Sequence, residues 1–196
     1  MSVSERILTY VMGLLYFHGV LKFEDLYAMT MKTISEGMSQ DDFRLLLEAA
    51  VDDDYGPYVF DMAEDYYFDI EVNDVHWVLA EQRKRDELDY RPVSEEVARW
   101  VVEDNYPLLW GDGEKGFIRW LLKRCGNDAG IVLPLFLDYE AAIKNNASLV
   151  DIAEKILEDL DVIELEEVRE VAALVKELYT HVPLWTLKGW TLADVL

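Results

Sequence analysis

The chain has 196 residues, of which 40 are acidic and 18 are basic, and its formal net charge is −22. Its apolar fraction of 52% excludes an intrinsically disordered chain, and its length is sufficient to bury one large or two small hydrophobic cores. A single cysteine, Cys125, excludes an internal disulfide and a cysteine-rich zinc site, which favours a reducing compartment and a cytoplasmic location.

The N-terminal region predicts two helices separated by a short strand. Apolar side chains between Ile7 and His18 recur at helical spacing behind Ser4, a possible N-cap, and Gly19 ends this first helix. The apolar run 20–23 is long enough for one small strand. Two acidic residues then open the second helix, because carboxylates stabilise a helix N-terminus.

A third helix and a β-hairpin follow. Ser39 is placed to cap the third helix, with Asp42 three residues later. The segments 58–61 and 66–71 are rich in aromatic and β-branched residues and predict the two strands of a hairpin. The order helix, short strand, helix, helix, hairpin is that of a winged-helix domain, and we assign it residues 1–90.

The remainder of the chain predicts a helical bundle. A fourth helix starting at residue 73 or 74 is interrupted before Pro92, and we place a domain boundary there. Residues 91–196 then form a helical bundle domain with a tryptophan-rich tail. The predicted fold class is therefore mainly α, with helices over residues 94–102, 116–124, 130–144, 148–160 and 165–182.

The third helix and the hairpin concentrate negative charge. Residues 41–74 contain twelve acidic residues and one basic residue, Arg44, so the segment carries a charge of −11. In a DNA-binding winged helix, this region faces phosphates, and basic side chains there release counterions. Binding of duplex DNA through this surface is therefore not expected.

The same field predicts a docking surface for a basic protein. Asp41, Asp42 and the aspartates 52–54 are expected to supply the long-range attraction. Exposed aromatic side chains add contact area, and Trp190, close to an incipient last helix, is a candidate anchor. The leading hypothesis is a non-enzymatic interaction domain whose candidate partner-binding residues are Asp41, Asp42, Asp52, Asp53, Asp54, Tyr55, Tyr58 and Trp190.

Besides an enzyme with a pocket that the sequence does not reveal, three alternatives remain open. The acidic face can be a solvated surface that keeps the protein soluble. It can also mimic DNA and inhibit a nucleic-acid-binding protein. The third alternative is a transcription regulator that binds DNA through another surface, such as the basic run 83–85, although neighbouring acids nearly cancel the charge of that run.

No catalytic residue, cofactor site or metal site is predicted. The run Gly111 to Gly116 has the spacing of a dinucleotide fingerprint but lacks a preceding strand, so we interpret it as an interhelical loop whose Asp112 caps the next helix. The aspartates 52–54 lack the ligand spacing of a calcium loop. His18 lies on an apolar helix face and is expected to be a hydrogen-bonded core residue, and Cys125 a buried structural one.

No membrane association is predicted either. No apolar stretch approaches the roughly 20 residues that a membrane span requires. Glu5 and Arg6 stand where a signal peptide needs a basic start followed by an apolar run.

The tail of the chain carries a suggestive motif. Residues 184–191, Leu-Trp-Thr-Leu-Lys-Gly-Trp-Thr, resemble the signature that closes a helical domain in uncharacterised bacterial proteins with a C-terminal SEC-C metal-binding motif. The turn 19–21 leading into residues 24–26, and the run 89–93, are also similar to that domain. Thr191 and Asp194 stand at the spacing of an N-cap and its partner, so a helix is expected to begin there.

What this resemblance implies about function is limited. The SEC-C motif is itself a cysteine-rich zinc knuckle, and this sequence has no such cluster, so no zinc ligand can be carried over. The resemblance supplies no catalytic residue. It implies an accessory helical part, separated from its knuckle, whose work is to bind another macromolecule.

Overall fold

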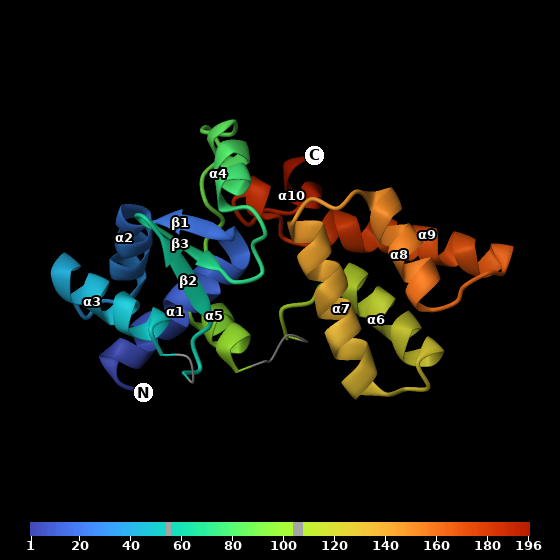
Figure 1. Ribbon diagram of the computed structural model, residues 1–196, viewed down its shortest axis with the longest axis horizontal. Coiled ribbons are helices and arrows are strands. Elements are labelled where there is room, and N and C mark those ends of the chain that lie inside the picture. The colour runs from blue at the N-terminus through green and yellow to red at the C-terminus, as the bar shows by residue number, and fades with distance from the viewer. Residues whose placement is uncertain (54–55, 104–107) are drawn as a thin grey trace. The chain divides into compact units, whose positions relative to one another are not determined.

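The computed structural model describes residues 1–53, 56–103 and 108–196. Its contacts divide the chain into two compact units (Figure 1). Unit 1 comprises Met1–Leu109 and Trp185–Gly189, and unit 2 comprises Trp110–Leu184 and Trp190–Leu196. The described chain is mainly helical with one small antiparallel sheet, so the predicted mainly α class with a small hairpin is confirmed.

Unit 1 begins with the order of elements that the sequence predicts. The first helix starts earlier than expected, because Ser2 rather than Ser4 is its N-cap and forms a capping box with Glu5. Ser39 caps the third helix as predicted, by accepting a hydrogen bond from the backbone N–H of Asp42. The elements are α1 (Val3–His18), β1 (Val20–Lys22), α2 (Phe23–Thr33), α3 (Gln40–Val51), β2 (Phe60–Ala63), β3 (Tyr66–Asp69), α4 (Val75–Arg83) and α5 (Glu95–Val102).

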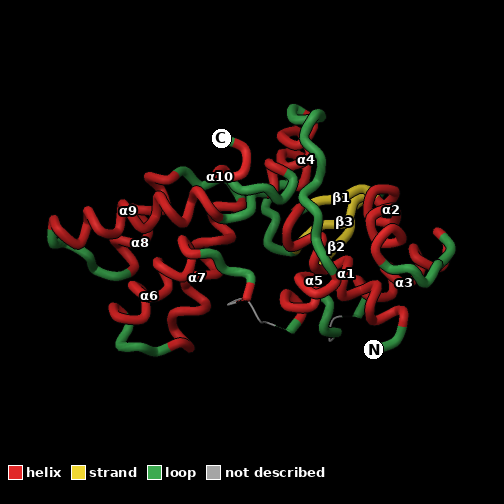
Figure 2. Tube along the Cα trace, turned by 180° about the vertical axis from the view of Figure 1, so that it is seen from behind, coloured by secondary structure: helices red, strands yellow, loops and turns green. Residues whose placement is uncertain are grey.

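The three strands lie side by side in the order β1-β3-β2, and both pairs are antiparallel (Figure 2). Tyr67 in the central strand pairs with Leu21 on one side and Met62 on the other. The first hairpin strand begins two residues later than predicted, because Glu64 adopts a left-handed φ of 56° and the turn needs only residues 64 and 65. Buried Phe60 and Tyr67 connect the sheet to the core.

Helix α1 forms the centre of the core of unit 1. Its buried side chains contact residues of the other helices and of the sheet. A Cβ atom added at Gly13 would lie 2.4 Å from the Cβ of Ala98, so α1 and α5 approach each other with almost no side chain between them. This contact makes α5 part of unit 1. The compact units therefore divide after Leu109, whereas the sequence places a boundary near residue 90.

The chain returns to unit 1 near its C-terminal end. Residues 185–189, which we call the tail segment, include the short helix η2 (Trp185–Leu187). Trp185 is 1% exposed, and its indole N–H donates to the carbonyl of Tyr16 at 3.0 Å. A Cβ at Gly19 would lie 2.5 Å from the Trp185 ring, and the φ of Gly19 is +73°, so this position requires glycine for both reasons.

Lys188 fixes the tail segment to the region after α4. Its ammonium group donates to the carbonyl oxygens of Arg85 at 2.8 Å and Leu88 at 2.6 Å. Its own carbonyl accepts from the backbone N–H of Arg91 at 3.0 Å. In addition, the side-chain amide of Gln82 donates to the carbonyls of His18 and Trp185, both at 2.9 Å. The tail segment is therefore an integral part of unit 1.

In the described part of unit 2, helices joined by short turns are the regular secondary structure. Apolar side chains such as Phe117, Phe136 and Leu178 form its core. Thr191 and Asp194 form the predicted capping box at the start of the last helix. No helix in the described ranges combines the length and the apolar character needed to cross a bilayer. The helices are α6 (Asp112–Arg124), α7 (Ala129–Lys144), α8 (Leu149–Asp159), α9 (Leu165–His181) and α10 (Leu192–Val195).

His18 is the hydrogen-bonded core residue that the sequence predicts. It is fully buried, and its Nδ1 lies 3.1 Å from the carbonyl of Lys188, so Nδ1 carries the proton and donates. Its Nε2 has no hydrogen-bond partner within the described part of the chain. Burial lowers the pKa of His18 from 6.5 to about 3, because a charged imidazolium would be desolvated there.

Replacing Lys188 by methionine tests the tail segment. The Lys188→Met variant loses two charge-assisted hydrogen bonds, while the Arg85 carbonyl keeps its bond from the Leu88 N–H, so the free energy of unfolding should fall by about 2–4 kcal/mol. Urea unfolding gives this value, and hydrogen exchange should place the loss in α1 and α4. The matched control Lys84→Met removes only an exposed ion pair with Glu81 and should cost about 0–1 kcal/mol. Equal losses in the two variants would contradict the role of Lys188.

Acid should destabilise unit 1 through His18. The folded state holds this imidazole neutral, whereas the unfolded chain binds a proton as the pH falls below 6.5. The contribution of His18 is therefore complete above this value and decreases toward about pH 3. Between pH 7.5 and 5.5 the free energy of unfolding should fall by about 1.4 kcal/mol from this source. His18→Gln should flatten the pH dependence and His76→Gln, at an exposed position, should keep it. Identical slopes would exclude His18 as the cause.

Candidate functional site

The outward face of α3 combines carboxylates with one apolar side chain. Phe43 and Leu47 point into the core, so the residues on the opposite side of the helix face solvent. Leu45 stands in the middle of that side and is 64% exposed. We define the α3 face by the exposed residues Asp41, Asp42, Leu45, Ala49, Asp52 and Asp53.

The acidic residues at the two ends of α3 have different relations to the fold. Asp41 and Asp42 lie in the first turn, where carboxylates favour the helix dipole, and Asp42 also accepts from the Ser39 hydroxyl at 2.6 Å. Asp52 and Asp53 follow the C-terminal end, where a carboxylate opposes the dipole. The last turn, residues 48–51, contains no basic residue to offset them. Helix stability therefore explains the first pair of acids and not the second.

The one basic residue of this region is engaged inside the unit. The guanidinium of Arg44 lies 3.8 Å from the ring centroid of Phe23, which is a cation–π contact. The same group donates to the Asp65 carboxylate at 3.1 Å. Arg44 is thus turned toward the body of unit 1, and the α3 face presents a field of one sign.

The aromatic residues expected to supply contact area have other surroundings. Asp54 and Tyr55 lie outside the described residues. Tyr58 is half-buried against the core, and its hydroxyl donates to the carbonyl of Glu5 at 3.4 Å. Trp190 is half-buried in unit 2, where its carbonyl accepts from the N–H of Leu184 at 3.0 Å.

Leu45 is the exposed apolar residue that the sequence analysis missed. It belongs to a run of three leucines, residues 45–47. The run could have revealed it, because consecutive helical residues cannot all face one side, and the inward positions Phe43 and Leu47 leave Leu45 opposite them. Its area on the α3 face replaces the contact area expected from Tyr58.

The basic run 83–85 does not form an open basic patch. Glu81 accepts from Lys84 at 2.5 Å and from Arg85 at 3.1 Å, so the expected pairing within the helical surface is present. Arg83 donates to the hydroxyl of Tyr66 at 3.1 Å. These contacts leave little net field for phosphate binding.

The interpretation of the glycine-containing run 111–116 is wrong in part. The run is not an interhelical loop, since all but its first residue belong to α6. Gly111 is the N-cap, and Asp112 is the first helical residue and makes no capping bond. Two glycines at positions 113 and 116 concealed the helix start, because glycine is a poor helix former.

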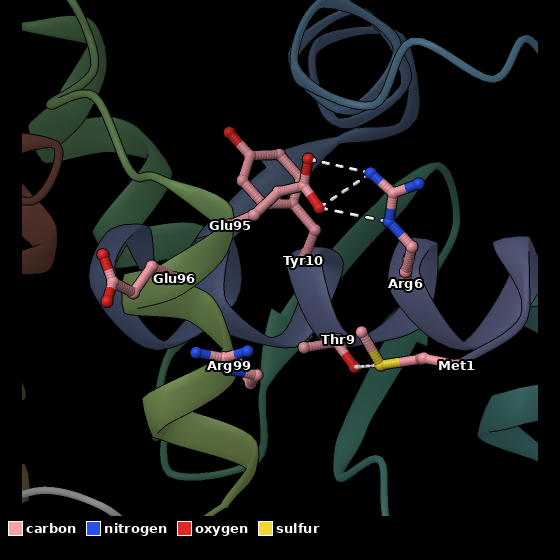
Figure 3. A pocket seen from close by; sticks show the side chains of 7 residues that line it. All are labelled: Met1, Arg6, Thr9, Tyr10, Glu95, Glu96 and Arg99. Carbon is pink, nitrogen blue, oxygen red and sulfur yellow. Dashed lines mark hydrogen bonds and ion pairs between the residues drawn. The ribbon is translucent and has the colours of Figure 1, made fainter.

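A small cleft of unit 1 lies between α1 and α5 and has a volume of about 170 Å³ (Figure 3). Arg6 reaches across it and donates to the Glu95 carboxylate at 2.9 Å, and Tyr10 donates to the carbonyl of Val93 at 2.9 Å. Ligand sites usually have about 300–1,000 Å³. The Arg6 and Tyr10 side chains are thus engaged in internal hydrogen bonds, and we do not assign the cleft as a ligand site.

Unit 2 contains buried charged residues that form internal contacts. Lys144 and Glu140 form an ion pair of 2.7 Å, and both side chains are almost completely buried. Burial raises the pKa of Glu114, a residue of the first turn of α6. Cys125 is half-buried rather than buried as predicted. No group of three metal-ligating side chains lies together in the part of the chain that the structure describes.

Comparison with known proteins gives no assignment. No protein-family model matches the chain, and no curated protein or solved structure is significantly similar to it.

Removal of the Arg44 guanidinium should weaken unit 1 measurably. Arg44→Met loses the contact with Phe23 and the pair with Asp65, so the free energy of unfolding should fall by about 1–2 kcal/mol. Arg99→Met is the control, because Arg99 forms an exposed pair with Glu103 on its own helix and should cost less than about 0.5 kcal/mol. Urea titrations of both variants make the comparison. A loss of equal size in both would show that the ring contact contributes nothing.

Proposed function

We propose that this protein is a non-enzymatic interaction domain and that the α3 face docks a basic surface of a partner protein. The observation that carries the proposal is Leu45, which is 64% exposed within a group of carboxylates. A purely solvating surface does not require a large apolar side chain at its centre. A docking surface does, because an apolar anchor inside a charged rim is the common arrangement of protein interfaces.

The two kinds of side chain contribute to different steps of binding. The carboxylates attract a cationic surface over a distance of about one Debye length, 8 Å at physiological salt, and so raise the rate of encounter. Leu45 contributes after contact, since burial of a leucine side chain is worth about 1.5–3 kcal/mol. Asp52 and Asp53, which oppose the dipole of α3, are retained at a cost to the helix that a binding role explains.

The same residues argue against the alternatives that involve DNA. The order of elements in unit 1 supports a winged-helix-like unit, but its third helix offers carboxylates where phosphates would lie. A DNA mimic would need charges spaced along a surface like phosphates, and a central leucine interrupts such a pattern. The resemblance to the helical domain that precedes a SEC-C motif fits the proposal, since that domain is expected to bind a macromolecule.

Neutralising the carboxylates of the α3 face should abolish binding of the partner protein. The variant Asp41→Asn, Asp42→Asn, Asp52→Asn, Asp53→Asn keeps the shape of the side chains and removes four charges. This variant should fail to capture the proteins that the wild type captures from lysate. Their binding to the wild type should weaken as salt rises from about 0.1 to 0.5 M. Quantitative mass spectrometry of the captured proteins provides the measurement.

Two further variants make this test specific. The control neutralises four exposed glutamates of unit 2, Glu154, Glu158, Glu164 and Glu166, to glutamine, and so makes the same change in net charge. It should retain the partners. Leu45→Ala should weaken capture without changing its salt dependence. Partners that persist with the α3 variant, or that resist strong screening, would contradict docking through this face.

A further inference from the structure

Helix α6 carries a basic strip in this strongly acidic chain. Residues 115–124 contain four basic residues and no acidic residue, whereas the whole chain has a net charge of −22. Lys115, Arg119 and Lys123 recur at intervals of four residues and are all exposed, so they lie along one side of the helix.

Of the four cations, Arg124 lies 3.5 Å from the Glu167 carboxylate, whereas the three on the exposed side of α6 are not paired with a carboxylate among the described residues. The guanidinium of Arg119 donates to the backbone carbonyl of Lys115 at 3.1 Å. Among the described residues, neither Lys115 nor Lys123 has an ion-pair partner. Arg124, in contrast, is held by the carbonyl of Leu160 at 2.9 Å. The strip therefore presents an attractive field for an anionic surface.

An open groove of about 540 Å³ runs beside this strip, between α6 and α9. Arg119 and Lys123 contribute charge to its wall, and Trp120 and Leu174 contribute apolar area. Trp120 is half-buried, with its ring stacked on that of Phe117 at 6.0 Å. The groove thus combines an apolar floor with a basic rim, and Glu170 is the acidic residue among its lining side chains.

We propose that this groove binds the α3 face of a second copy of the chain, so that the protein self-associates head to tail. The inference rests on the proposed function, because it names a basic surface that the α3 face can dock. The two surfaces are opposite in charge, and each has an apolar centre: Leu45 on one and Trp120 with Leu174 on the other.

The two surfaces also agree in length. On an ideal helix with a rise of 1.5 Å per residue, Asp41 and Asp52 are about 16 Å apart, and Lys115 and Lys123 are about 12 Å apart. Leu45 lies between the acidic ends, as Trp120 lies between basic residues of α6. Docking of Leu45 on the groove therefore brings carboxylates close to the cations on both sides.

Net charge sets the conditions under which this contact forms. Two copies of charge −22 repel each other over about 30 Å at 0.01 M salt and over only about 8 Å at 0.15 M. Pairs in direct contact are screened much less. Self-association should consequently be stronger at about 0.15 M salt than at about 0.01 M, the reverse of a simple attraction between two opposite net charges.

Sedimentation velocity on the full chain tests the proposal with complementary variants. The acid-face variant carries Asp52→Lys and Asp53→Lys, at the C-terminal end of α3 where cations favour the helix dipole, and the groove variant carries Arg119→Glu and Lys123→Glu. Each alone should self-associate about tenfold or more weakly than the wild type. An equimolar mixture should recover a 1:1 complex, because one variant keeps its groove and the other keeps its α3 face. Lys32→Glu with Lys176→Glu, at exposed positions elsewhere, should behave as the wild type.

The outcomes separate this inference from the proposed function. A wild type that stays monomeric at every concentration, or a mixture that fails to associate, overturns self-association. If the groove variant then still captures the lysate partners of the wild type and the acid-face variant does not, the docking role of the α3 face stands without it. Circular dichroism of both variants confirms that the exposed substitutions leave the helices intact.

Discussion

The hydrogen bonds of the Lys188 ammonium group to the carbonyls of Arg85 and Leu88 join the tail segment to a part of unit 1 that lies 103 and 100 residues earlier in the sequence. Both carbonyls lie beyond the end of α4; that of Arg85 also accepts from the backbone N–H of Leu88 at 3.1 Å. The bonds position the tail segment, which places Trp185 against α1 and gives His18 its acceptor. Together with the hydrogen bonds of Gln82 and of the Trp185 indole, this cation holds the segment that covers one side of α1.

The distribution of charge follows from how the few basic residues are used. With 18 basic against 40 acidic residues, each cation that pairs internally leaves the surface more negative. Arg44, Arg6 and Lys144 are all engaged in contacts within their own units. The basic strip of α6 departs from this pattern. The chain therefore presents two surfaces of opposite sign, and these are the two for which we propose binding roles.

The sequence predicted what short-range physics controls. Ser39, Ser94, Ser148 and Thr191 cap helices where hydroxyl side chains precede helical patterns, and the hairpin appears where aromatic residues cluster. The exact strand start and the extent of α6 were missed, because pairing register and two glycines override local preference. The acidic character of α3 was readable from composition. The exposure of Leu45 and the inward turn of Arg44 depend on which side of α3 packs on the core.

Long-range contacts are the part that no local pattern reveals. Nothing near Gly13 shows that Ala98 will lie against it, and nothing near Lys188 shows that its acceptors are 100 and 103 residues away. These contacts decide the boundary of unit 1. A division of the chain by composition alone places it near residue 90, at a proline, since a break in helical pattern is the only signal available.

The return of residues 185–189 to unit 1 has a consequence during synthesis. The 75 residues 110–184 separate them from the rest of the unit. At about 5–20 residues per second, the ribosome therefore needs roughly 4 to 15 s to reach the tail segment after it has completed the N-terminal part of unit 1. Until then the nascent N-terminal half has an open apolar site beside Gly19. During that interval, a chaperone that binds apolar segments can bind this exposed site. A truncated chain that ends before residue 185 keeps the site exposed, so quality-control proteases can recognise it.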